Sequence, residues 1–168
     1  MGGPVVGGEG AVHPLSKQCR DFLQATLSSG HRVVLSPPVN AEWKKHESGF
    51  ARKWRVAMFA RKKVLLDDVA EDQALRDAIE RSAKGERDRV AMIKDAHLVE
   101  VARVTDRTVV SLDDTVRRLF SAASKSVRSL RTVVWANPRH QAEDCSAWLA
   151  DGALPEGHRQ LGAWRPTT

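Results

Sequence analysis

The sequence has few cysteines and no long apolar segment. Cys19 and Cys145 stand far apart and outside any CxxC pattern, so they predict neither a zinc site nor a disulfide framework. We expect two ordinary thiols in a reducing cytoplasm. The N-terminus shows no basic segment followed by an apolar run, and no apolar stretch approaches the roughly 18 residues that span a bilayer. We therefore expect a cytoplasmic protein with neither a signal peptide nor a membrane span.

Motifs of the common nucleotide-binding and nucleophilic enzymes are also missing. The Gly-rich stretch 7–10 lacks the Gly-Lys-Ser/Thr ending of a phosphate-binding loop, and it lacks the GxGxxG spacing. No Ser/His/Asp or Cys/His arrangement has the flanking residues of a nucleophilic site. These absences count against P-loop enzymes and against hydrolases that use a side-chain nucleophile.

The composition is that of a globular, basic chain. Its 168 residues are 42% hydrophobic, which suits one domain with one core. The 27 Lys and Arg against 21 Asp and Glu give a net charge of +6 and a pI near 9.7. This balance favours an anionic partner such as nucleic acid. Many basic domains bind no nucleic acid, so the charge alone does not decide the function.

Hydrophobic periodicity predicts short apolar strands that alternate with helices. The expected strands cover residues 32–35, 108–112 and 132–135. The expected helices cover about residues 14–28, a segment that begins after Ser36, 48–66, 72–83, 87–104, 114–124 and 138–150. This alternation is typical of a parallel sheet with helices on both faces, in which ligands bind beyond the carboxyl ends of the strands. We expect one domain over residues 1–168, with an irregular tail at 153–168 and a Gly-rich start at 1–12 that is either flexible or the remnant of a strand.

Asp95 stands out among the acidic residues because it lies on the apolar stripe of its predicted helix. It comes four residues after Ala91 and three before Leu98. An ionised carboxylate on such a stripe is costly unless it is paired or binds a metal. A place at the edge of the stripe, beside a neighbouring cation, is the simpler explanation.

Glu42, Asp113 and Asp114 are the other candidate ligands. Glu42 shares a helix face with apolar residues, although glutamate is also common on helix surfaces. Asp113 and Asp114 directly follow the strand 108–112, where Asp is also a favoured N-cap, so one can cap the helix while the other faces the site. A carboxylate cluster without Cys or His ligands suits Mg²⁺ or Mn²⁺, and such sites typically hydrolyse phosphodiesters.

A basic segment supplies candidate contacts to a phosphate backbone. The candidate nucleic-acid-binding residues are Lys45, Arg52, Lys53, Arg61, Lys62 and Lys63. A solvated helix face, with aliphatic stems packed along the surface, accounts for the same pattern equally well. The five tryptophans fall mostly on apolar faces, so we expect them to pack in the core rather than to stack on bases.

The order of these segments resembles the PIN-domain family over roughly residues 14–135. HRVVLSPPVNAEWKKH is similar to the strand, turn and helix that carry the family's second acid, and KDAHLVEVARVTDRTVVSLDD to the segment with the third and fourth. The resemblance implies a three-layer α/β/α domain with a short parallel sheet. It also implies that Glu42, Asp95 and Asp113, with Asp114 as the alternative to Asp113, bind one or two Mg²⁺ or Mn²⁺ ions and cut single-stranded RNA.

The family's first aspartate has no counterpart here. Family members begin with a central strand that ends in Asp-x-Asn or Asp-x-Ser, whereas Val5 and Val6 precede Gly7, and Glu9 stands in place of the Asn or Ser. We expect the first strand to be truncated or degenerate. Three explanations compete: the sequence starts downstream of the true first codon, the chain is a non-catalytic member, or Glu9 substitutes for the missing acid.

The resemblance leads to two functional hypotheses. The first is a metal-dependent ribonuclease, and many family members of this kind are toxins of bacterial toxin–antitoxin pairs. The second is a non-catalytic module that binds RNA or a protein. RNA, an antitoxin protein and a second copy of the chain are the candidate partners. A third hypothesis is an unrelated α/β domain in which the acids fall together by coincidence.

Overall fold

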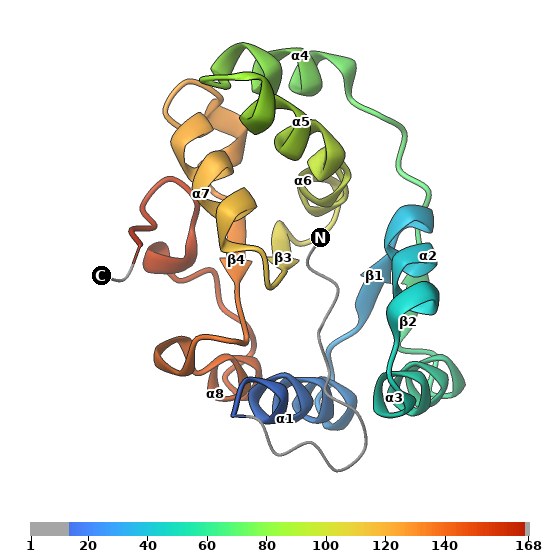
Figure 1. Ribbon diagram of the computed structural model, residues 1–168. Coiled ribbons are helices and arrows are strands. Elements are labelled where there is room, and N and C mark those ends of the chain that lie inside the picture. The colour runs from blue at the N-terminus through green and yellow to red at the C-terminus, as the bar shows by residue number, and fades with distance from the viewer. Residues whose placement is uncertain (1–13, 167–168) are drawn as a thin grey trace. The chain divides into compact units, whose positions relative to one another are not determined.

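The computed structural model describes residues 14–166 and divides the chain into two compact units. Within this range, unit 1 covers residues 14–68 and 137–154, and unit 2 covers residues 69–136 and 155–166. Each unit combines helices with one pair of short parallel strands (Figure 1). The chain is therefore mixed α/β and mostly helical. The single domain over residues 1–168 stays a prediction, and the candidate first strand with Val5, Val6, Gly7 and Glu9 lies outside the described residues.

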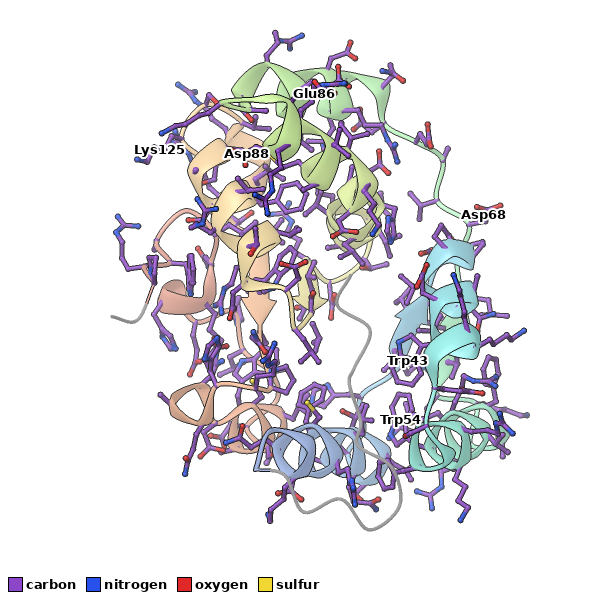
Figure 2. All side chains as sticks on the ribbon, viewed as in Figure 1. Trp43, Trp54, Asp68, Glu86, Asp88 and Lys125 are labelled. Atoms are coloured by element: carbon purple, nitrogen blue, oxygen red, sulfur yellow. The ribbon has the colours of Figure 1, made fainter. Side chains whose placement is uncertain are left out.

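Unit 1 is a small sheet with four helices. Its elements are α1 (Pro14–Ser28), β1 (Val33–Leu35), α2 (Pro37–His46), α3 (Gly49–Ala60), β2 (Val64–Leu66) and α8 (Cys145–Ala150). β1 pairs with β2 in parallel, with Val34 opposite Leu65. α1 packs against α3 and α8. The indole nitrogen of Trp54 donates to the Leu23 carbonyl at 2.6 Å, and the rings of Trp43 and Trp54 lie 5.1 Å apart (Figure 2).

Unit 2 holds a larger apolar core. Its elements are α4 (Gln73–Ser82), α5 (Glu86–Lys94), α6 (Ala96–Val104), β3 (Thr108–Val110), α7 (Asp114–Ala123) and β4 (Val134–Ala136), with short 3-10 helices at Arg128–Leu130 and Gly157–Arg159. β3 pairs with β4 in parallel, with Val109 opposite Trp135. Phe120 and Trp135 are fully buried in the centre of this core. Gln160 forms an antiparallel bridge with Val134, so the tail that the sequence predicts to be irregular is partly joined to the sheet.

The predicted helix over 48–66 is too long. α3 ends at Ala60, and Lys62 adopts a left-handed backbone with φ of 54°. The chain then reverses, and Val64–Leu66 becomes β2. The apolar run that suggested a last helical turn instead forms a ladder with β1. Parallel pairing is confirmed, but the described strands form two separate sheets of two strands instead of one sheet.

Two other predicted helices have different boundaries. The segment 87–104 is broken at Asp95, which ends α5 and begins α6 with φ of −103° and ψ of 9°. The segment 138–150 starts with a 3-10 turn at Gln141–Glu143, and α8 begins only at Cys145. Asp144 causes this delay, because its left-handed backbone ends the turn and its side chain accepts from the Ala147 amide.

The predictions about thiols and tryptophans hold. Cys19 and Cys145 are both buried and form no disulfide. Trp54, Trp135 and Trp148 are buried as well, which agrees with a packing role. Within residues 14–166, the helices are all too short or too polar to cross a lipid bilayer.

Candidate acidic site

Asp95 lies at the junction of α5 and α6 in unit 2. Its side chain is half-buried and makes no helix-capping hydrogen bond. Burial raises the pKa of the Asp95 carboxyl above its ordinary value, and the negative charge of Asp113 raises it further, whereas the nearby His97 and Lys94 lower it. Asp95 is therefore a partly desolvated carboxylate at a helix break.

Asp113 lies at the carboxyl end of β3 and caps α7. One carboxylate oxygen accepts from the Val116 amide at 2.9 Å, and the Asp113 amide donates to the Ser111 hydroxyl at 3.2 Å. The next residue, Asp114, is half-buried in the first helical turn. The two carboxylates stabilise the start of this helix, because the helix dipole places partial positive charge there. The sequence prediction that one aspartate caps the helix is confirmed, and Asp113 is that residue.

Asp95 and Asp113 come from segments far apart in the sequence, but Asp95 ends α5 and Asp113 caps α7, two helices that pack against each other in unit 2. The charge of Asp113 makes the smallest contribution to the raised pKa of Asp95. Two carboxylates in one place suit a hard cation, since Mg²⁺ commonly uses one or two carboxylates and fills its other positions with water and phosphate oxygens. The donor set thus fits Mg²⁺ or Mn²⁺. Within residues 14–166, no group of three or more His, Cys, Asp or Glu side chains forms a ready cage for an ion.

Glu42 belongs to the other unit. It lies half-buried on α2 in unit 1, whereas Asp95, Asp113 and Asp114 all belong to unit 2. The role of Glu42 as a third ligand stays a prediction.

The predicted basic residues divide into two groups. Lys63 and Arg61 contact the C-terminus of α1: the Lys63 ammonium donates to the carbonyls of Thr26, Leu27 and Ser29 at 2.6, 2.9 and 2.5 Å, and Arg61 donates to Leu27 at 3.2 Å. Desolvation, followed by the charge of Arg61, lowers the pKa of Lys63. These contacts satisfy carbonyls that a helix end leaves without partners.

The other predicted basic residues are exposed: Lys45, Arg52, Lys53 and Lys62. Arg52 lies 3.3 Å from Glu47, whose carboxylate also accepts from Arg55 at 2.8 Å. These hydrogen bonds, chiefly the one from Arg55, lower the pKa of Glu47. The structure therefore assigns Arg61 and Lys63 a capping role and leaves the exposed residues as the better candidates for binding phosphate.

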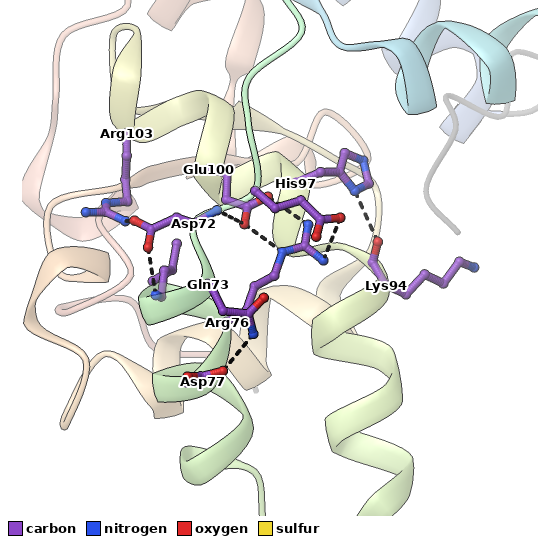
Figure 3. Close-up of polar contacts among 10 residues, drawn as sticks. Asp72, Gln73, Arg76, Asp77, Lys94, His97, Glu100 and Arg103 are labelled. Atoms are coloured by element: carbon purple, nitrogen blue, oxygen red, sulfur yellow. Dashed lines mark hydrogen bonds and ion pairs between the residues drawn. The ribbon is translucent and has the colours of Figure 1, made fainter.

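Glu100 is an important acidic residue that the sequence reading passed over. It is only 3% exposed, and its carboxylate accepts two hydrogen bonds from the Arg76 guanidinium at 2.7 and 2.8 Å (Figure 3). The Asp72 amide donates to it at 3.0 Å. Arg103 in turn donates to the Asp72 carboxylate at 2.7 Å. This ion-pair network joins α4 to α6.

The signal that pointed to Asp95 applies equally to Glu100. Both acids interrupt the apolar segment AMIKDAHLVEVA, and both are withdrawn from water to some degree. Glu100 is fully paired, which is what a buried carboxylate in a structural role requires. Its partner, Arg76, comes from α4, and the pairing depends on tertiary packing that the sequence pattern does not show.

Comparison with known proteins adds no relative. No family model, no curated protein and no solved structure matches the chain.

Proposed function

We propose that the chain is a PIN-like ribonuclease that uses Mg²⁺ or Mn²⁺ to hydrolyse phosphodiester bonds of single-stranded RNA. The observation that carries the proposal is that Asp95 and Asp113, which the resemblance selects from distant segments, stand at the ends of two packed helices of unit 2 and interact electrostatically. β3, which precedes Asp113, pairs in parallel with β4, and this is in keeping with a site at the carboxyl end of a sheet. The finer fold, a three-layer α/β/α PIN domain, is part of the same proposal.

The acid pair provides the ligands in this proposal. Asp95 and Asp113 would hold the ion, with Asp114 as a further oxygen donor. A divalent ion there would neutralise charge on the scissile phosphate and lower the pKa of the attacking water. Partial burial of Asp95 strengthens its attraction for a cation, because the surroundings screen the charge less than bulk water does.

The test is cleavage of a labelled single-stranded RNA in Mn²⁺ by the whole chain. We expect cleavage by the wild type and a loss of at least about 100-fold in Asp95→Asn and Asp113→Asn, since each removes a charged ligand. Asp113→Asn is informative because asparagine is also a good N-cap, so α7 keeps its capping group. Asp88→Asn, on α5 outside the acid pair, is the matched control. Wild-type RNA that stays intact in Mn²⁺ and Mg²⁺ would rule out catalysis by this chain.

A second candidate function is a non-catalytic module of the same fold that binds RNA through unit 1. The absence of a group of three potential ligands among residues 14–166 favours it, as does the exposed basic group that includes Lys45 and Lys62. RNA binding that persists in EDTA and in Asp95→Asn, without cleavage, would select this alternative. Lys63→Ala is unsuitable for that test because Lys63 caps α1. A toxin role, an antitoxin partner and a homodimer remain proposals that follow from the resemblance. Cytoplasmic location, expected from the cysteines and the N-terminal sequence, also remains a proposal.

A further inference from the structure

The net positive charge of the protein is concentrated in one segment of unit 1. Residues 44–63 hold eight Lys and Arg and one Glu. The rest of the sequence therefore holds 19 Lys and Arg and 20 Asp and Glu, which nearly cancel. A basic pI that arises from a single segment marks a local surface for an anionic partner more strongly than a uniform excess would.

α3 lies at the centre of this segment and has two different faces. Its inward face carries Ala51, Trp54 and Met58, which are buried. Its outward face carries Arg52, Val56 and Phe59 at intervals of four and three residues, with Lys53 next to Arg52, and all four are exposed. The cations thus stand about two helical turns from Phe59 on one continuous surface.

Phe59 is the unusual member of that face. The residue is 37% exposed, and Val56 one turn before it is 58% exposed. Among residues 14–166, no other Phe or Trp is as exposed, and no Tyr occurs in the sequence. An exposed aromatic ring within a basic segment is a combination that binds single-stranded nucleic acid, because the ring stacks on a base while the cations contact phosphates.

We propose that the outward face of α3 and the turn that follows it bind an unpaired base of single-stranded RNA, with Phe59 stacking on the base and Lys53 on the helix and Lys62 in the turn contacting nearby phosphates. This inference rests on RNA being the substrate, as proposed above, and it adds a binding site separate from the acid pair. Unpaired bases are required because a base inside a duplex has both faces covered by its neighbours. The charge of the segment selects nucleic acid over a neutral protein partner.

The test measures binding of a labelled single-stranded RNA and of the matching RNA duplex to the whole chain in EDTA. We expect Phe59→Ala and Phe59→Leu each to weaken single-strand binding by about fivefold or more, because neither residue offers an aromatic face. Phe59→Trp should keep the affinity within about twofold, since tryptophan also stacks. Duplex binding should be the same for all the variants. Val90→Ala, which shortens an exposed valine of α5 in unit 2, is the matched control.

Each contrary result overturns the proposal. Wild-type affinity in Phe59→Ala would show that binding is electrostatic only. Wild-type affinity in Phe59→Leu, with loss in Phe59→Ala, would indicate apolar contact of the kind a protein partner makes. Failure of the wild type to bind the single strand would also refute it. The binding assay contains EDTA, so it does not depend on the proposed metal-dependent cleavage. Asp95→Asn should lose cleavage and keep Phe59-dependent binding. If the wild type binds through Phe59 but cleaves no RNA, the proposed catalysis fails and the base-binding site stands.

Discussion

Each unit buries a carboxylate that is paired with an arginine, Glu47 with Arg55 in unit 1 and Glu100 with Arg76 in unit 2, but their other charges are placed differently. Unit 1 has cations on an exposed helix face. A few of its other cations, chiefly Lys63 and Arg61, donate hydrogen bonds to main-chain carbonyls of the same unit. Unit 2 places carboxylates inside its structure, where Glu100 is fully paired and Asp95 is half-buried beside Asp113. The difference shows that the role of a charged residue depends on the groups that it contacts in the fold, and the sequence pattern alone does not reveal these groups. Exposed cations suit binding of a polyanion, whereas a partly buried acid pair suits binding of a cation.

The largest predicted loss of stability comes from breaking the ion pair of Glu100 in unit 2. Glu100→Ala should lower the free energy of unfolding by about 3–5 kcal/mol, because it leaves the Arg76 guanidinium in a desolvated place without its carboxylate. Urea denaturation of the two proteins measures this loss. Glu80→Ala removes an exposed partner of Arg89 and should cost at most about 1 kcal/mol. If the two variants lose the same free energy of unfolding, the buried ion pair is no more stabilising than the exposed one, and the prediction is wrong.

The next largest predicted effect is a difference in stability between variants of two neighbouring lysines of unit 1, Lys62 and Lys63. Lys63→Ala should lower the free energy of unfolding by about 1–3 kcal/mol, because three carbonyls at the end of α1 lose a charged donor. Lys62→Ala removes an exposed side chain, so its change should stay within about 0.5 kcal/mol. Denaturant unfolding of both variants checks the prediction, which is wrong if Lys62→Ala proves the more damaging change.

A third prediction concerns the salt dependence of RNA binding. Changing Lys44, Lys45 and Lys62 together to Ala should reduce the slope of log affinity against log salt by about 2, because each phosphate contact on a single strand contributes about 0.7. The matched control changes three exposed cations of unit 2, Lys84, Arg87 and Lys125, to Ala. Both triple variants lower the net charge by the same amount. RNA titrations at several salt concentrations therefore show whether the position of the removed cations, and not only their number, sets the slope. Equal slopes would remove the special role of unit 1.

The smallest effect concerns the pH dependence of stability in EDTA. The folded-state pKa of Asp95 is raised by burial, so its contribution to stability is present below the unfolded pKa and is lost as the pH rises through the folded value. Asp95→Asn should therefore raise the Tm at pH 7 by a small amount, on the order of 1–2 °C. This advantage should disappear below about pH 4, where Asp95 is protonated as well. A Tm that falls at pH 7 would show that the ionised carboxylate is stabilising.

The sequence predicts much of the fold because local patterns suffice for most elements. Helix α1 has the predicted bounds, Pro14–Ser28, and the apolar runs at Val33–Leu35, Thr108–Val110 and Val134–Ala136 are strands. β2 was missed because a three-residue apolar run after a helix has no periodicity of its own. The pairing that makes it a strand comes from β1, which lies about 30 residues earlier.

The candidate site was less predictable than the fold. An acid on an apolar stripe indicates burial, but the stripe cannot show whether the acid is paired. Glu100 is held by Arg76 from a different helix, and that contact depends on tertiary packing. The same limit applies to Lys63, whose position in a basic run suggested nucleic acid although its ammonium contacts the end of α1.

Isothermal titration of the whole chain with Mn²⁺ tests the central claim most directly, because the proposed function depends on the Asp95–Asp113 pair holding a divalent ion. Wild type and Asp88→Asn should bind Mn²⁺ with the same affinity, and Asp95→Asn and Asp113→Asn should each weaken that binding by about tenfold or more, as expected when a carboxylate ligand becomes an amide. Identical Mn²⁺ binding by all four proteins, or none by the wild type, would contradict the account.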